Sequence, residues 1–301
     1  MTDATTSNAG DLDLSDLRPR RSVLYMPAAN ARALEKAKTI PADALIFDLE
    51  DAVAPDAKPA ARDQAAAAAA SGAYGAREVT IRCNGLDTPW GGDDLVAAAA
   101  AGPAAVVIPK VESVSYLADV SERLTAAGAP DSVRIWAMIE TPTAIFDARE
   151  IAAVDRVAVL IMGTNDLAKE LRAVAGSDRA PLLPHLSTAV LAARESGKVV
   201  LDGVYNNIAD AEGFAAECQQ GMAMGFDGKT LIHPNQVEVA NDVWAPADDE
   251  VAEARTVIAA FAEAEADGRG VVTVDGRMIE NLHVDNARRT LAVADAIAAL
   301  T

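Results

Sequence analysis

Acidic side chains stand where short apolar runs of this sequence end, and their type suits a hard cation. Glu140 closes the run RIWAMIE, and Asp166 lies three residues after the run VAVLIMG. Magnesium commonly takes one or two protein carboxylates and keeps several waters, whereas zinc prefers His or Cys ligands. We therefore expect Glu140 and Asp166 to share one Mg²⁺. For either acid alone, a salt bridge with Arg82 or Lys110 is the simpler interpretation.

Further charged residues lie at the ends of neighbouring runs. Asp48 and Glu50 are two apart in ALIFDLED, so they point to one face, and we expect them to support the site by accepting hydrogen bonds from metal-bound water. Arg82 carries a planar fork of donors that fits a substrate carboxylate or a developing oxyanion; its alternative role is charge balance. Lys110 ends AAVVIPK and is a candidate substrate-binding residue, unless it neutralises Asp48 or Glu50.

Eight short β-branched runs must position these residues, and Ala-, Leu- and Glu-rich stretches separate them. The runs are residues 21–27, 44–51, 78–85, 104–110, 134–140, 157–163, 199–206 and 226–233. This alternation predicts a (β/α)₈ TIM barrel, in which the C-terminal ends of the strands carry the chemistry. A doubly wound open sheet is the alternative.

The alternation stops after Pro234, and the pattern becomes helical. We therefore expect a flexible acidic leader (residues 1–20), a barrel (21–234) and a C-terminal helical segment (235–301). The polar start lacks the basic and then apolar order of a signal peptide. The longest apolar window, 95–109, is shorter than the roughly 20 residues of a membrane span.

The charge balance and the cysteines limit which partners and which cellular compartment we expect for this protein. With 26 basic and 45 acidic residues the formal net charge is −19, which argues against nucleic acid as the main partner and disfavours anionic membrane. Cys83 and Cys218 are far apart and in no metal-like cluster, so a disulfide framework is excluded. We expect a protein of the reducing cytoplasm.

The sequence resembles the superfamily of the citrate lyase beta subunit and malyl-CoA lyase, which contains magnesium-dependent CoA-ester enzymes. The resemblance runs from about Arg21 to the C-terminus and is carried by nine motifs in order: RSVLYMPAANARALEKA, ALIFDLEDAVAPDAK, IRCNGLDTPWG, VVIPKVES, WAMIETPTAI, MGTNDLAKEL, LDGVYN, GFDGKTLIHPNQ and DGRMIENLHVDNARRTL. It implies a (β/α)₈ barrel whose C-terminal segment forms a lid over a neighbouring subunit in a homotrimer or hexamer.

The resemblance also implies roles for single residues. Glu140 and Asp166 would bind Mg²⁺, while Arg82 and Glu140 would contact the substrate. In lyases of the superfamily, an Asp that follows a Met-Ile pair in the lid acts as acid/base. Glu280 holds that position here, in MIENLH, so the carboxylate is retained on a side chain that is one methylene longer.

We therefore expect a Mg²⁺-dependent lyase that cleaves a malyl-CoA-like 3-hydroxyacyl-CoA to an acyl-CoA and a 2-oxo acid. The motifs MGTNDLAKEL, DGVYN, GFDGKTLIHP and ENLH look most like the (3S)-malyl-CoA thioesterase branch, so hydrolysis to malate and CoA is the alternative. Two other hypotheses are a non-catalytic scaffold or subunit of a multi-chain citrate lyase, and a metal-free barrel with a solvated acidic mouth. The sequence does not specify whether the acyl group of the substrate is malyl, methylmalyl, citramalyl or citryl, because one methylene changes the binding free energy by only about 1 to 3 kcal/mol.

Overall fold

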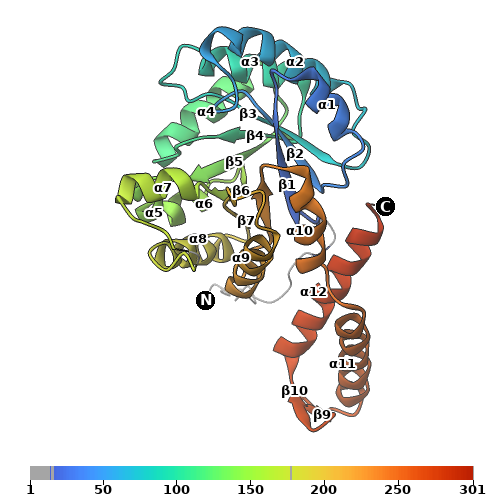
Figure 1. Ribbon diagram of the computed structural model, residues 1–301. Helices are drawn as coiled ribbons and strands as arrows, with labels where there is room; N and C mark the ends of the chain where they lie inside the picture. The colour runs from blue at the N-terminus through green and yellow to red at the C-terminus, as the bar shows by residue number, and fades with distance from the viewer. Residues whose placement is uncertain (1–13, 15–16, 177, 301) are drawn as a thin grey trace, which may run out of the picture. The chain divides into compact units, whose positions relative to one another are not determined.

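The computed structural model describes residue 14, residues 17–176 and residues 178–300, so most of the predicted leader lies outside the described residues. The described chain forms two compact units (Figure 1). The larger unit is Arg20–Trp244. The smaller unit runs from Ala245 to the end of the described chain and includes the described residues before Arg20.

Eight parallel strands of the larger unit close into a barrel in chain order, with β8 paired to β1 (Figure 1). The strands are β1 (Ser22–Pro27), β2 (Ala44–Asp48), β3 (Glu78–Arg82), β4 (Ala105–Ile108), β5 (Arg134–Ile139), β6 (Val157–Met162), β7 (Val199–Asp202) and β8 (Gly228–Leu231). The predicted TIM barrel is confirmed, and the open sheet is excluded.

Helices follow the strands and cover the outside of the barrel. They are α1 (Ala31–Ala37), η1 (Pro55–Ala57), α2 (Lys58–Ala70), α3 (Gly91–Ala101), α4 (Val114–Ala126), α5 (Pro142–Phe146), α6 (Ala148–Ala152), α7 (Thr164–Leu171), α8 (Leu183–Glu195), α9 (Ala211–Met224), η2 (Pro234–Gln236) and α10 (Val237–Val243). Their ends follow local chemistry: the Ser113 side chain accepts from the Tyr116 amide at the start of α4, and Gly225 ends α9 with φ of 97°. Helix α10 packs against β1 and α9, within the larger unit.

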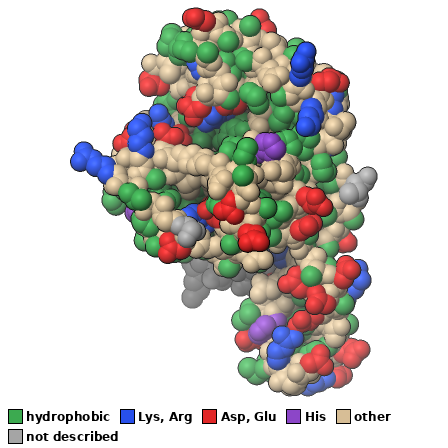
Figure 2. Space-filling view, viewed as in Figure 1, with side chains coloured by type: hydrophobic (Ala, Val, Ile, Leu, Met, Phe, Trp, Pro, Cys, Tyr) green, Lys and Arg blue, Asp and Glu red, His purple; other side chains and the backbone are tan. Residues whose placement is uncertain are grey.

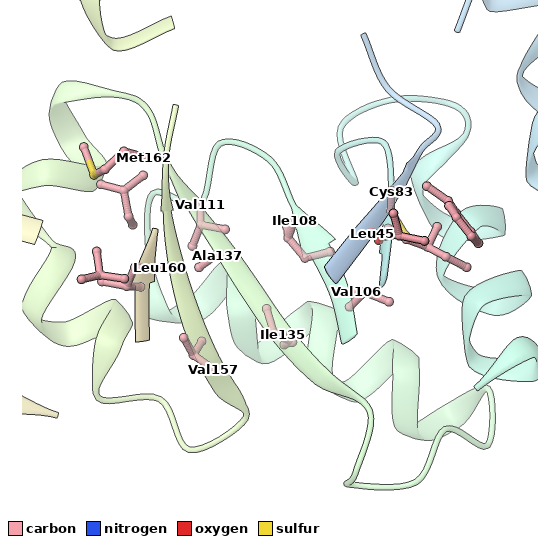
Figure 3. Packing of buried hydrophobic residues seen from close by; sticks show 14 of the residues in the cluster. Leu45, Cys83, Val106, Ile108, Val111, Ile135, Ala137, Val157, Leu160 and Met162 are labelled. Carbon is pink, nitrogen blue, oxygen red and sulfur yellow. Dashed lines mark hydrogen bonds between the residues drawn. The ribbon is translucent and has the colours of Figure 1, made fainter. Parts of the chain in front are cut away.

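Side chains of the strands alternate between two hydrophobic clusters. One cluster fills the barrel and consists of Val23, Ala44, Ile46, Ala105, Val107, Trp136, Met138, Val159, Ile161 and Leu201. The other includes outward-facing residues such as Leu45, Val106, Ile135 and Leu160, which Figure 3 shows among their neighbours. Because helices cover the outer face, the strands are apolar on both faces and not only on alternate residues.

Seven of the eight strands end earlier than the predicted runs, and this difference shapes the mouth of the barrel. Strand β2 ends at Asp48, because the Asp48 carboxylate accepts hydrogen bonds from the amides of Glu50 (2.9 Å) and Ala52 (3.1 Å). Such side-chain bonds to nearby amides turn the chain out of the sheet. The polar residues that follow the strands therefore stand above the sheet, in loops or, for Asp166, in the first turn of a helix.

The smaller unit has its own core. It contains α11 (Asp248–Ala266), a hairpin of β9 (Val272–Val274) and β10 (Arg277–Ile279), and α12 (Asn281–Ala298). Its buried apolar cluster consists of Ala254, Val257, Phe261, Ile279, Val284 and Ala287. None of the described helices has the length and apolar character that crossing a bilayer requires.

Candidate active site

A cavity of about 430 Å³ lies at the C-terminal ends of the barrel strands. Its charged lining residues are Asp48, Asp51, Arg82, Glu140 and Asp166. Met138, Met162, Val204 and Ile232 contribute apolar walls. Figure 2 shows a hollow in the larger unit with hydrophobic side chains inside and charged side chains at its edge. A site of this composition can hold the polar end of a small molecule against fixed charges.

Glu140 follows β5 directly and is 3% exposed. The main-chain amide of Lys110 donates a hydrogen bond to its Oε1 at 2.8 Å. Burial raises the pKa of Glu140 to about 7, although the Lys110 amide opposes this shift, and the Asp166 carboxylate raises the pKa further. Glu140 is thus a buried carboxylate beside a second carboxylate. A cation that binds between two such groups stabilises their charged forms, so the pair is a candidate cation site.

Asp166 lies in the first turn of α7, immediately after β6. Glu140 and Asp166 line the main cavity and also a second one of about 340 Å³, so the two acids form a shared wall. The described part of the chain contains no cluster of three or more His, Cys, Asp or Glu side chains that could hold a metal. A pair of carboxylates with room for water fits Mg²⁺, which commonly takes only one or two, better than it fits zinc.

Arg82 ends β3 and is held by acids from the β2 end. Its guanidinium forms a fork with Asp48, at 2.6 and 2.7 Å, because these residues are partners in the β2–β3 register. It also contacts Glu50 at 2.7 Å and Asp51 at 3.4 Å. Asp48 and Glu50 therefore contact the arginine, while their expected bonds to metal-bound water stay a prediction. Burial raises the pKa of Glu50 to about 7, although Arg82 opposes the shift.

Sequence reasoning missed two residues that hold this arginine cluster. The Tyr25 ring lies 4.9 Å from the Arg82 guanidinium, and its hydroxyl reaches the Met138 sulfur at 3.9 Å. The buried Lys58 donates to the main-chain oxygens of Leu49 (2.8 Å) and Glu50 (2.9 Å) and to Asn84 (2.7 Å). The available signals were a tyrosine near the end of the first run and a lysine eight residues after Glu50.

The structure does not bring every predicted site residue into the cavity. The side chain of Lys110 is exposed and makes no ion pair with the described acids; Asp48 and Glu50 pair with Arg82 instead. Lys110 lines the second cavity, so its proposed contact with substrate stays a prediction. Glu280 lies in the smaller unit, directly before α12, and its proposed role in catalysis stays a prediction.

Gly163 provides a test of the geometry around Glu140. A Cβ added at Gly163 would lie 2.3 Å from Glu140 Oε2 and 2.4 Å from its Cβ. We expect Gly163→Ala to displace Glu140, to destabilise the fold by about 1 to 3 kcal/mol and to weaken magnesium binding. Thermal unfolding and calorimetric titration with magnesium measure both effects. Gly92→Ala, in α3 of the same unit, is the control, because an added Cβ there meets only the end of the Arg123 side chain at 3.9 Å. Unchanged magnesium affinity in Gly163→Ala would contradict the assignment of Glu140.

The fold and the site define a TIM-barrel protein whose mouth holds a pair of acids, one buried and one partly buried, and an arginine that is paired with acids. Residues 21–234 match the family described as HpcH/HpaI aldolase/citrate lyase, and the chain belongs to this family. Residues 180–298 also match a family described as a C–C bond lyase of the TIM-barrel fold. The predicted superfamily is thereby confirmed.

Two named relatives cover nearly the whole chain. The (3S)-malyl-CoA thioesterase of Cereibacter sphaeroides (strain ATCC 17025) is 50% identical over 281 residues, which are 93% of this chain and 96% of the relative. The citrate lyase subunit beta of Escherichia coli (strain K12) is 36% identical over 284 residues, covering 92% and 94%.

A solved structure supports the same relationship. The protein CitE of Mycobacterium tuberculosis, in complex with magnesium, acetoacetate and coenzyme A, aligns with a TM-score of 0.76 at 31% identity. The alignment covers 93% of this chain and all of that protein.

Proposed function

We propose that this chain is a Mg²⁺-dependent enzyme of malyl-CoA-like 3-hydroxyacyl-CoA thioesters, and that it hydrolyses the thioester to malate and CoA. The observation that carries the proposal is the joint presence of Glu140, Asp166 and Arg82 around one cavity. The preference for hydrolysis rests on 50% identity over 93% of the chain to a (3S)-malyl-CoA thioesterase.

The proposed roles follow from the charges of the side chains. Glu140 and Asp166 would hold Mg²⁺, which when bound polarises the oxygen atoms of the malyl end. Arg82 would donate a hydrogen bond to the thioester oxygen, which becomes negative when water attacks the carbonyl carbon and the C–S bond then breaks. Asp48 would keep the guanidinium in this orientation, because its fork fixes two of the arginine nitrogens.

Carbon–carbon cleavage is the second candidate, and the match of residues 180–298 to a C–C bond lyase family favours it. In that reaction the C3 hydroxyl loses its proton to water, the bond between C2 and C3 breaks, and the products are a 2-oxo acid and the enolate of an acyl-CoA. Arg82 would then stabilise the enolate oxygen, and Glu280 would deliver the proton to C2. The same cavity serves both reactions.

Product analysis separates the candidates. The purified chain is incubated with malyl-CoA and magnesium, and glyoxylate, acetyl-CoA, malate and free CoA are measured. Malate with free CoA supports hydrolysis, whereas glyoxylate with acetyl-CoA establishes the lyase. An absence of turnover for all free CoA esters would favour the hypothesis of a scaffold or a citrate lyase subunit.

We further propose a homotrimer or hexamer in which the smaller unit of one subunit serves the cavity of another. This part of the proposal rests on the superfamily resemblance and on the carboxylate at Glu280. A cytoplasmic location is also proposed, supported by Cys83 and Cys218, which are both free and buried.

Glu280→Gln is expected to slow turnover by about 10² or more with little change in KM, since it removes a proton carrier but keeps the shape. The control is Glu253→Gln, in α11 of the same unit. Mixing Glu280→Gln with Asp166→Ala subunits should restore activity if the carboxylate acts in trans. An unchanged rate in Glu280→Gln would remove this residue from the mechanism.

A further inference from the structure

Lys110 has a backbone conformation that is unusual for a residue other than glycine. Its φ is 48°, in the left-handed region that favours glycine. Four non-glycine residues in the described part of the chain have positive φ, and two of the others stand where such angles are common. Arg172 ends helix α7, and Asp275 lies in the turn of the β9–β10 hairpin. Lys110, in contrast, follows barrel strand β4 and lines the second cavity.

The left-handed turn directs the main chain of Lys110 toward Glu140. The Lys110 amide donates to Glu140 Oε1 at 2.8 Å, and the next amide, of Val111, donates to the Met138 oxygen at 3.3 Å. The chain thus leaves strand β4 while its main-chain amides remain hydrogen-bonded to residues at the end of β5. The Lys110 side chain is exposed and takes no part in these bonds.

Glu140 is fixed on a second side by the absence of a side chain at Gly163. An added Cβ there would lie 2.3 Å from Oε2, so this oxygen occupies space that only glycine leaves open. Among the described residues, no hydrogen bond reaches Oε2. The amide of Lys110 therefore holds one oxygen of Glu140, while the other stays available beside Asp166.

We infer that Lys110 is a positioning residue for Glu140, acting through its left-handed main chain, and that its ammonium group is dispensable for this role. The inference rests on the proposed function, in which Glu140 binds the cation. It differs from the sequence-based expectation, which gave Lys110 a contact with substrate through the ammonium.

A matched pair of variants separates the main chain from the ammonium. Lys110→Gly and Lys110→Val both remove the charge, but glycine adopts a φ of 48° freely, whereas β-branched valine resists it. We expect the magnesium Kd, measured by calorimetry, to stay within about twofold of wild type in Lys110→Gly. In Lys110→Val it should rise by roughly tenfold or more, as for other lost supporting contacts of metal ligands.

Asp275→Val is the control, because it places valine at the same φ of 48° in the β9–β10 turn of the smaller unit; its magnesium Kd should not change. An equal loss in Lys110→Gly and Lys110→Val would overturn the inference, since the ammonium would then be the active group. Wild-type affinity in folded Lys110→Val would overturn it as well. If Lys110→Val does not fold, Lys110→Asn is tested instead, because asparagine also lacks the charge but tolerates this φ. A tenfold loss of magnesium affinity in Lys110→Asn would contradict the inference.

The experiment distinguishes a failure of the proposed function from a failure of the inference about Lys110. Wild-type protein that binds no magnesium overturns the metal site, and kcat/KM for malyl-CoA across the same variants then decides whether Lys110 positions Glu140. A wild-type chain that neither binds magnesium nor turns over malyl-CoA overturns both.

Discussion

Asp166→Ala is expected to lower kcat/KM for malyl-CoA by about 10³ or more and to abolish magnesium binding detectable by calorimetry. The substitution leaves a single buried carboxylate to hold a cation that takes at most a few protein ligands. The barrel should remain folded, because Asp166 lies in the first turn of a helix at the mouth and is only partly buried. Circular dichroism and thermal unfolding check the fold.

The matched control is Asp63→Ala, which removes an exposed acid from helix α2 of the same unit. It should bind magnesium and turn over substrate like wild type. Asp166→Ala with wild-type activity, or wild-type activity in the presence of a chelator, would refute the assignment of Asp166.

Arg82→Met should reduce both stability and catalysis. The guanidinium contacts Asp48, which is 2% exposed, and removing one partner of a buried ion pair costs about 3 to 5 kcal/mol. Loss of a donor to a developing oxyanion should lower kcat by about 10² to 10³. Denaturant unfolding measures the first effect, and kcat with saturating malyl-CoA measures the second.

A double variant separates the two effects. Adding Asp48→Asn to Arg82→Met removes the unpaired buried charge but also one of the two acceptors for the amides of Glu50 and Ala52, so part of the lost stability should return. The rate should stay low, because no donor faces the thioester oxygen. Recovery of the rate together with the stability would show that Arg82 supports the fold but does not act on substrate.

The barrel could be predicted from the sequence because its strands are buried on both faces. Each of the eight runs contains one strand, and β1, at 22–27, differs from its run by one residue. The predicted C-terminal ends of the strands were less accurate, since the run 44–51 continues three residues beyond β2. Hydrophobicity identifies a buried strand, but the turn after Asp48 depends on hydrogen bonds that its carboxylate accepts from the amides of Glu50 and Ala52.

The candidate site was predicted in part. Glu140, Asp166 and Arg82 line one cavity, because polar residues after parallel strands meet at one end of a barrel. The partner of Asp48 depends on the β2–β3 register, which aligns it with Arg82 and which local sequence does not specify. The hydrogen bond that the Lys110 main-chain amide donates to Glu140 depends on a backbone angle that is rare for lysine.

The charges around the main cavity have a consequence for the sequence of binding events. Four carboxylates line it, from Asp48, Asp51, Glu140 and Asp166, against the single guanidinium of Arg82. A dicarboxylate or phosphate-bearing molecule approaching this mouth is repelled until a divalent ion has neutralised part of the lining. For the proposed reaction, loading is therefore ordered: the ion arrives first, and the anionic thioester follows.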